Sequence, residues 1–326
     1  MTRVEPLVSI GLPVRNGEHT VGRAIRTVLE QDHANLELVI SDNASDDGTE
    51  EICRELARSD TRVRYIRQPE NIGLIPNFYA VLHEARGTYF KWMGHDDWLA
   101  PAFVRRCVEV LDDDPSLILV TTRQGHVGAG GEIESASYDR NGLQSADPVE
   151  RFRDMLRVYN DSLLLLDPLY GMIRPGPVAA LPRPVMLYED QVFAGRLALA
   201  GPFGHIDEEL SYRLPAPYVT RAAIARRLGV PTWQVHVANL LMCRELWTVV
   251  GEAGLAPRER RAARTAIVPF FLRRERMTVA HRARKVAGLV SSLPARVFTG
   301  ASRQRAVDAD AHPCSRSVAA APNTDP

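Results

Sequence analysis

The sequence predicts an α/β fold in which helices cover both faces of a mostly parallel sheet. Over the first third of the chain, short apolar runs alternate with segments whose apolar residues recur at helical spacing. Acidic loops follow two of these apolar runs. Strands that alternate with helices imply right-handed crossover connections, and such connections make neighbouring strands parallel.

Apolar runs predict five strands in this part of the chain. The first should end at Pro13, because proline has no N–H to donate to a neighbouring strand. The predicted strands are residues 7–12, 36–40, 63–66, 88–93 and 117–121.

Four helices are expected between these strands. Glu50 and Glu51 favour the first turn of the second helix, where a carboxylate interacts well with the helix dipole. Pro76 and Pro101 are expected at the first position of the third and fourth helices, where no backbone N–H is needed. The predicted helices are residues 21–31, 49–57, 76–85 and 101–111.

The rest of the chain has a weaker pattern. Residues 123–147 are rich in Gly, Ser and polar side chains, which is typical of a loop-rich insertion, and 163–174 fits either a helix or a strand. Helices are expected over 148–159 and 189–200, with a pair of terminal strands over 205–214. Beyond residue 217 the chain should turn helical.

Composition limits the classes of function. The formal net charge is +0, which argues against a dedicated nucleic-acid binder. The start of the chain lacks a signal-peptide pattern and no apolar run is long enough to span a membrane, so we expect a cytoplasmic protein. The four cysteines lie far apart without zinc-site spacing, which favours a reducing compartment: Cys53, Cys107, Cys243 and Cys314.

The first acidic loop begins at Asp42, directly after the second predicted strand. Its carboxylate could accept a hydrogen bond from the imide of uracil or thymine. The same loop residues, Asp42, Asn43, Ser45 and Asp46, are also types that form turns and cap helices, so a purely structural role stays open.

The second acidic loop contains Asp96 and Asp97, between the fourth predicted strand and the following helix. Adjacent carboxylates repel each other unless they are solvated or bound to a cation. Mg²⁺ and Mn²⁺ prefer one or two carboxylates together with substrate phosphates. A solvated turn before the helix is the alternative.

A third acidic pair, Glu189 and Asp190, opens a predicted helix and could simply favour its dipole. A carboxylate across a crevice from a metal could instead take a proton from an acceptor hydroxyl. Arg213, and also Arg67, could contact a diphosphate through charge-assisted hydrogen bonds. Loops at the carboxyl ends of strands meet at one crevice, so these groups should lie together.

The ordered set of motifs resembles glycosyltransferase family two, whose fold is called GT-A. The resemblance covers roughly residues 7–214. It rests on residues 8–16, 42–49 and 71–73, on Asn77, on 87–89, and on Asp96, Asp97, Glu189, Asp190, Tyr212 and Arg213.

The resemblance implies roles for particular residues. The aspartate of the Glu189–Asp190 pair is the usual general base, and the metal-binding Asp-x-Asp signature aligns with Gly94-His95-Asp96. Because Gly94 replaces the first acid, metal coordination should rest on Asp96 and Asp97. The expected nucleotide-binding residues are Pro13, Val14, Arg15, Asn16, Asp42, Asn43, Ser45 and Asn71.

The expected activity is therefore a metal-dependent inverting glycosyltransferase that uses Mg²⁺ or Mn²⁺. The donor should be a nucleotide-diphosphate sugar, with UDP or dTDP favoured, and the acceptor a hydroxyl of a glycan, a glycolipid or another molecule, in cell-envelope synthesis. A catalytically degenerate protein that binds nucleotide-sugars or glycans is the alternative. A dinucleotide-binding dehydrogenase is disfavoured, because its glycine-rich motif is absent.

We divide the chain into a GT-A domain over 1–217, with a nucleotide-sugar half (1–122) and an acceptor half (123–217), followed by a helical arginine-rich region over 218–299. A tail over 300–326 should be disordered. The basic segment 258–285, interleaved with apolar residues, could contact the inner face of the cell membrane. A helix packed on the domain with a solvated basic face is the alternative.

Overall fold

The computed structural model describes residues 5–128, 130–161, 166–214 and 220–291. Its contacts group residues 1–278 into one compact unit and 279–326 into a second. The sheet and the helices that cover it belong to the first unit. The predicted tail and part of the ambiguous segment 163–174 lie outside the described residues. Within the described part, no helix is both long and apolar enough to cross a bilayer.

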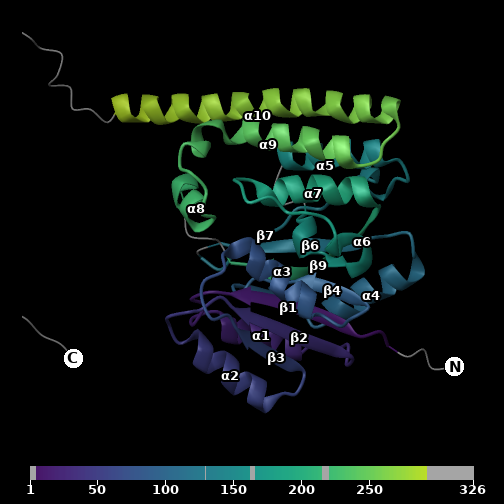
Figure 1. The fold of residues 1–326 in the computed structure, drawn as a ribbon, viewed down its shortest axis with the longest axis vertical. Helices are drawn as coiled ribbons and strands as arrows, with labels where there is room; N and C mark the ends of the chain where they lie inside the picture. Colours follow the sequence, from purple (N-terminus) through teal and green to yellow (C-terminus); the bar gives the residue numbers. More distant parts are fainter. Residues whose placement is uncertain (1–4, 129, 162–165, 215–219, 292–326) are drawn as a thin grey trace, which may run out of the picture. The chain divides into compact units, whose positions relative to one another are not determined.

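The described strands form one sheet with the order β3-β2-β1-β4-β8-β6-β9-β5, and β7 pairs with β6 (Figure 1). The long ladders, β1 with β2 and β4, β2 with β3, and β6 with β9, are parallel, and the short ones are antiparallel. The strands are β1 (Val8–Val14), β2 (Leu36–Asp42), β3 (Val63–Arg67), β4 (Tyr89–Trp92), β5 (Asp97–Leu99), β6 (Leu119–Val127), β7 (Ile133–Glu134), β8 (Met172–Ile173) and β9 (Phe203–Arg213).

Helices cover both faces of the sheet, so the expected fold class is confirmed. Alternating side chains of β4 show the two faces: Tyr89 packs in the core under α1, α2 and α4, whereas Phe90 packs under α3, α5 and α7. The helices are α1 (Val21–Leu29), α2 (Thr49–Ser59), α3 (Leu74–Glu84), α4 (Phe103–Asp113), α5 (Pro148–Asp161), α6 (Pro175–Ala179), α7 (Glu189–Ala200), α8 (Arg221–Arg227), α9 (Gln234–Glu252) and α10 (Pro257–Ser291), with 3-10 turns η1 (Gly142–Gln144) and η2 (Pro168–Tyr170).

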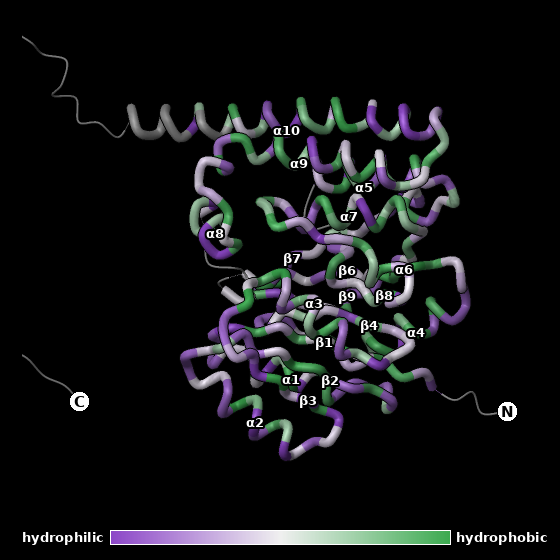
Figure 2. Tube along the Cα trace, viewed as in Figure 1, coloured by the Kyte–Doolittle hydropathy of each residue, from purple (hydrophilic) through white to green (hydrophobic). Residues whose placement is uncertain are grey.

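The helices α7, α9 and the first part of α10 are stacked outward from the sheet (Figure 1). α10 contributes Ala263, Ile267 and Phe270 to the larger core. Other residues of α9 and α10 remain exposed, and hydrophobic and hydrophilic residues alternate along both helices (Figure 2). The expected helical C-terminal region is therefore present, and α10 runs through Pro269 without ending there.

The first strand does not end at Pro13, as the sequence predicts, but continues to Val14. Gly11 accepts a hydrogen bond from Met93, so it faces β4. Pro13 faces the same side two residues later, because strand residues alternate in direction. β4 has ended at Trp92 by then, so the missing N–H of Pro13 costs no ladder bond.

Four other local predictions were also wrong. Pro101 is not the first residue of the fourth helix, because α4 begins at Phe103 after the cap residue Ala102. Pro76 lies in the third position of α3, because that helix begins at Leu74. The single long strand β9 replaces the expected pair over 205–214. Asp97 opens the short strand β5, which pairs with the end of β9, instead of lying in a loop before a helix.

The expected loop-rich insertion contains regular structure at both ends. β6 extends to Val127 because β9 pairs with it as far as His126, and β7 then turns back on it. In the described part of 163–174, η2 precedes the two-residue strand β8, which inserts between β4 and β6. These pairings depend on distant partners, so local periodicity gives no sign of them.

Candidate active site

A cleft of about 570 Å³ lies at the carboxyl ends of β1, β2 and β4. This is the edge of an α/β sheet at which ligands usually bind. Nine of the residues predicted for the site line it: Pro13, Val14, Arg15, Asn43, Asn71, Asp96, Glu189, Asp190 and Arg213. Five do not appear in its lining: Asn16, Asp42, Ser45, Asp97 and Arg67.

Hydrogen bonds tie together the three loops at one end of the cleft. The Arg15 guanidinium donates to the carbonyl oxygens of Asn43 (2.7 Å) and Ala44 (2.8 Å). The Asn43 amide donates to the Asn71 side chain (2.8 Å) and to the Gly73 carbonyl (3.2 Å). The rim therefore has a fixed shape before any ligand binds.

Asp42 lies beneath this rim and is fully buried. Its Oδ1 accepts hydrogen bonds from the backbone N–H and the hydroxyl of Ser45, at 2.9 and 2.6 Å. Its Oδ2 accepts from the Tyr65 hydroxyl (2.6 Å) and the Arg67 guanidinium (2.8 Å). The carboxylate thus holds the loop together. Its predicted role in binding a base stays a prediction.

Asn16 and Arg67 also serve this loop. Asn16 adopts a left-handed backbone conformation (φ 54°), its N–H donates to Ser45, and its side chain accepts from the N–H of Asp46. Arg67 pairs with Asp42 and with Glu50. Arg67 does not appear in the lining of the cleft, and its predicted phosphate contact stays a prediction.

The second acidic loop places two carboxylates over Gly94. A Cβ at Gly94 would lie 2.8 Å from Asp96 Oδ1 and 2.9 Å from Asp97 Oδ2, so a larger residue would not fit without movement. Asp96 lines the cleft. Neighbouring His95 turns its Nδ1 to the Thr20 hydroxyl (2.8 Å), and burial lowers the pKa of its imidazole.

Asp97 lies behind Asp96 and is 6% exposed. Its carboxylate accepts from the Gly94 N–H and from the Arg213 guanidinium, both at 3.2 Å. Arg213 also reaches Asp167 (3.3 Å) and lies over the Tyr170 ring. Burial opposes the charge of Arg213, but Asp97 and Asp167 outweigh it and raise the arginine pKa.

Among the described residues, no group of three or more His, Cys, Asp or Glu side chains could hold a metal alone. Asp96, with Asp97 behind it, nevertheless fits a cation that takes its other ligands from a bound diphosphate. Mg²⁺ is commonly held by one or two carboxylates in this way.

The two residues of the third acidic pair have different surroundings. Glu189 is buried and accepts two hydrogen bonds from the Arg183 guanidinium, at 2.6 and 2.8 Å. Asp190 lines the cleft, and burial, followed by the charges of Glu189 and Asp167, raises its pKa to about 6. A carboxyl group with such a pKa is suited to accept a proton near neutral pH.

The backbone just before this pair is strained. Tyr188, which precedes α7, has a left-handed conformation with φ 63°, a region that a bulky residue rarely adopts. Such conformations often occur at functional sites, where they fix the direction of a side chain. Here the turn brings Glu189 and Asp190 to the cleft at the start of the helix.

Residues 9–169 match the model of the family described as Glycosyl transferase family 2. This segment is a glycosyltransferase family 2 domain. The chain is 32% identical over 153 residues to chondroitin synthase of Escherichia coli, and this match covers 45% of this chain and 22% of that protein. It is 31% identical over 134 residues to hyaluronan synthase of Pasteurella multocida, and this match covers 41% of this chain and 14% of that protein.

Solved structures confirm the GT-A fold of the family 2 domain. Staphylococcus aureus TarS 1–349 in complex with UDP is 15% identical, with a TM-score of 0.59 over 80% of this chain and 70% of that one. A mannosyltransferase of Pyrobaculum calidifontis in complex with GDP-Man and Mn²⁺ is 17% identical, with a TM-score of 0.50 over 90% and 82%.

Four charged residues that line the cleft were not predicted from the sequence: Asp167, Arg183, Arg226 and Arg227. Arg226 and Arg227 end the short helix α8 and have no carboxylate partner within the described part of the chain. Two adjacent arginines in a sequence do not show whether their side chains contact a ligand or are solvated at the surface. Asp167 and Arg183 could be recognised only through their partners Arg213 and Glu189.

Proposed function

We propose that this domain transfers a sugar from a nucleotide-diphosphate donor to a hydroxyl acceptor with inversion at the anomeric carbon. One observation carries the proposal: Asp190, with its raised pKa, and Asp96 line the same cleft. A basic carboxylate and a carboxylate free for a cation are the two groups that such a transfer needs in one place.

In the proposed mechanism Asp190 is the general base. It takes the proton of the acceptor hydroxyl while that oxygen forms a bond to the anomeric carbon of the donor. The bond from that carbon to the donor phosphate oxygen breaks on the opposite face, and its electron pair leaves with the diphosphate. Glu189 stays paired with Arg183 and fixes the start of α7, so we give it a positioning role.

Asp96 would hold a divalent cation, Mg²⁺ or Mn²⁺, together with the donor diphosphate, and Asp97 would support it from behind. When bound, such a cation neutralises the charge that develops on the leaving diphosphate. Arg226 and Arg227 lack acidic partners in the described structure and line the same cleft, so they would add charge-assisted hydrogen bonds to the phosphates.

The donor nucleoside would lie at the rim formed by Pro13, Val14, Arg15, Asn43 and Asn71, with UDP or dTDP favoured. Similarity to chondroitin and hyaluronan synthases supports a polysaccharide or another cell-envelope glycan as acceptor. The same proposal places the protein in the cytoplasm, with the basic segment 258–285 toward the inner face of the membrane.

Calorimetry with UDP, dTDP and GDP tests the nucleotide and metal roles together. We expect binding of one nucleotide to be strong with Mn²⁺ and weak with chelator. Asp96→Asn should abolish the increase in nucleotide affinity that Mn²⁺ causes. Asp113→Asn, an equal change at an exposed site on α4, should leave this increase intact. A nucleotide affinity that changes neither with Mn²⁺ nor with Asp96→Asn would contradict the metal role.

A protein that binds nucleotide-sugars or glycans without catalysis is the second candidate. Gly94, which leaves no first acid in the metal motif, is the observation that favours it. Slow hydrolysis of a nucleotide-sugar in the presence of Mn²⁺ separates the two, because transferases commonly pass sugar to water when no acceptor is present. Binding without any turnover of donor, with or without glycan acceptors, would favour the second candidate.

A further inference from the structure

The α9 and α10 helices form an exposed apolar groove whose lining shares no residue with that of the cleft. Leu240 and Trp247 on α9 are 55% and 47% exposed, and Val268 on α10 is 54% exposed. Two adjoining hollows of about 390 and 470 Å³ share Trp247 and Val268 in their lining. Leu272 is one turn further along α10, outside the lining of these two hollows, and is 56% exposed. Several large apolar side chains gathered at one exposed place indicate a binding surface.

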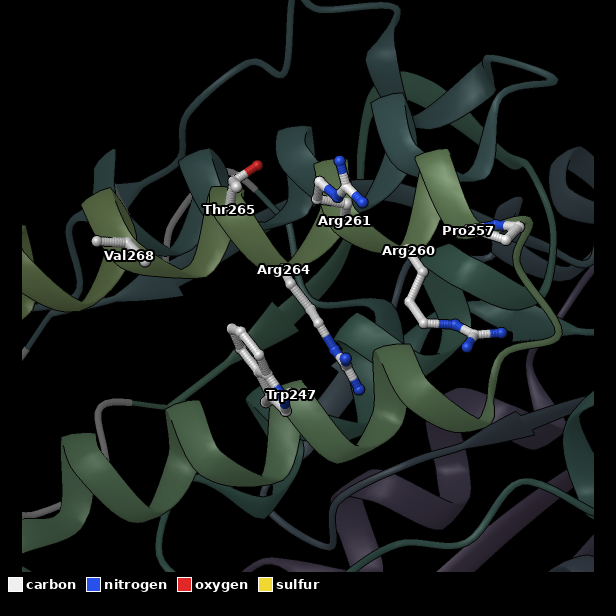
Figure 3. Close-up of a pocket in the computed structure, with 7 residues that line it drawn as sticks. All are labelled: Trp247, Pro257, Arg260, Arg261, Arg264, Thr265 and Val268. Carbon is white, nitrogen blue, oxygen red and sulfur yellow. The ribbon is translucent and has the colours of Figure 1, made fainter.

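Arginines surround this groove. Arg244 lines one hollow, and Arg260, Arg261 and Arg264 line the other. Figure 3 shows Arg264 extending from α10 toward Trp247 of α9, and its guanidinium carbon lies 4.6 Å from the centre of the indole. The groove therefore presents apolar side chains between positive charges.

The acids of the two helices do not neutralise these arginines. Glu245 and Glu252 pair with Arg196 of α7. Glu259 accepts from the backbone N–H of Ala256, at the start of α10, and Glu275 accepts from Asn239. Within the described residues, Arg244, Arg261 and Arg264 have no acidic partner.

We propose that the α9–α10 groove docks the protein on an anionic lipid bilayer, with Trp247, Val268 and Leu272 entering the interface and the arginines contacting lipid phosphates. Tryptophan prefers the boundary between headgroups and acyl chains, and arginine can bury its stem while its head stays at the phosphates. This surface extends the segment 258–285 expected from the sequence, because α9 supplies half of it.

A second copy of the chain fits the groove less well. A two-fold interface places the same patch on both partners, so arginines would face arginines. The acids that could compensate are already engaged inside each copy. Lipid phosphates supply the missing negative charge, and acyl chains cover the apolar side chains.

Flotation of the full chain with lipid vesicles tests this proposal without any sugar donor, so its failure would leave the transferase assignment untouched. We expect binding to vesicles of phosphatidylcholine mixed with phosphatidylglycerol, little binding to phosphatidylcholine alone, and loss of binding at high ionic strength. Failure to bind the anionic vesicles at low ionic strength would overturn the proposal, as would equal binding to both lipids.

Matched variants locate the surface. Arg244→Gln with Arg261→Gln should lower vesicle affinity roughly 30-fold, which is the factor for about 1 kcal/mol per basic residue. Arg58→Gln with Arg86→Gln removes the same charge from exposed positions elsewhere and should have little effect. Equal losses in the two double variants would overturn the groove as the site.

A second pair of variants tests the apolar contact. Val268→Gln with Leu272→Gln should also weaken binding, whereas Ile133→Gln with Val185→Gln, at similarly exposed sites elsewhere, should not. Thermal unfolding checks that each variant is folded. Sedimentation would reveal a dimer. A dimer that the groove variants dissociate, without vesicle binding, would assign the surface to a second copy and overturn the proposal.

Discussion

The two ends of the cleft use acidic residues in opposite ways. Asp42 has both carboxylate oxygens filled by hydrogen bonds from Ser45, Tyr65 and Arg67. Asp96 and Asp190 face the cleft, and Asp190 has a raised pKa. An acidic residue in a motif can therefore either hold the site together or act in the reaction, and the hydrogen-bond partners of its carboxylate oxygens show which.

The largest expected effect comes from removing the base. Asp190→Asn should reduce turnover about 10²–10⁴-fold, because general-base assistance is typically worth that factor. Nucleotide binding, measured by calorimetry, should stay nearly unchanged. Asp113→Asn is the control and should affect neither quantity. An equal loss of turnover and of nucleotide binding would instead show that Asp190, like Asp42, holds the site together and is not the base.

The pH dependence of the reaction gives a second test of the role of Asp190. Burial and nearby acids raise the pKa of Asp190 to about 6, and a general base must be deprotonated. We therefore expect kcat/KM to fall about tenfold per pH unit below pH 6 and to be level above it. A profile that stays level down to pH 4.5 would contradict the assignment.

The raised pKa of Asp190 also affects the free energy of unfolding. The ionised carboxylate lowers the stability of the fold, whereas an acid in an ion pair raises it. The folded state disfavours the charged form of Asp190, so the carboxylate destabilises the protein above pH 6 and this cost disappears as pH falls toward the unfolded-state value of 3.8. Asp190→Asn should accordingly raise the melting temperature at pH 7 but not near pH 4.

The smallest effect is expected for the acid that builds the site. Asp42→Asn should lower the free energy of unfolding by about 1–3 kcal/mol, since buried partners lose hydrogen bonds. Denaturant unfolding measures this loss, with Asp113→Asn again as the control. If stability is unchanged while nucleotide binding disappears, Asp42 contacts the ligand directly and the contrast between the two ends fails.

Local patterns in the sequence predict the order of the elements and most of the cleft. The α7 helix lies at the predicted residues, and Asp96 and Asp190 share a cleft. What the patterns miss depends on distant partners. Strand β5 has three residues and exists because β9 pairs with it, and Arg183 enters the site through its ion pair with Glu189.

Gly94 shows how a chain can depart from a signature without losing the site. The volume that an acidic side chain would occupy at this position is already taken by the carboxylate oxygens of Asp96 and Asp97. A search pattern that demands an acid there would discard this chain. A pattern that allows a glycine there, followed by two acidic residues whose carboxylate oxygens lie over it, would retain this chain and any relatives with the same substitution.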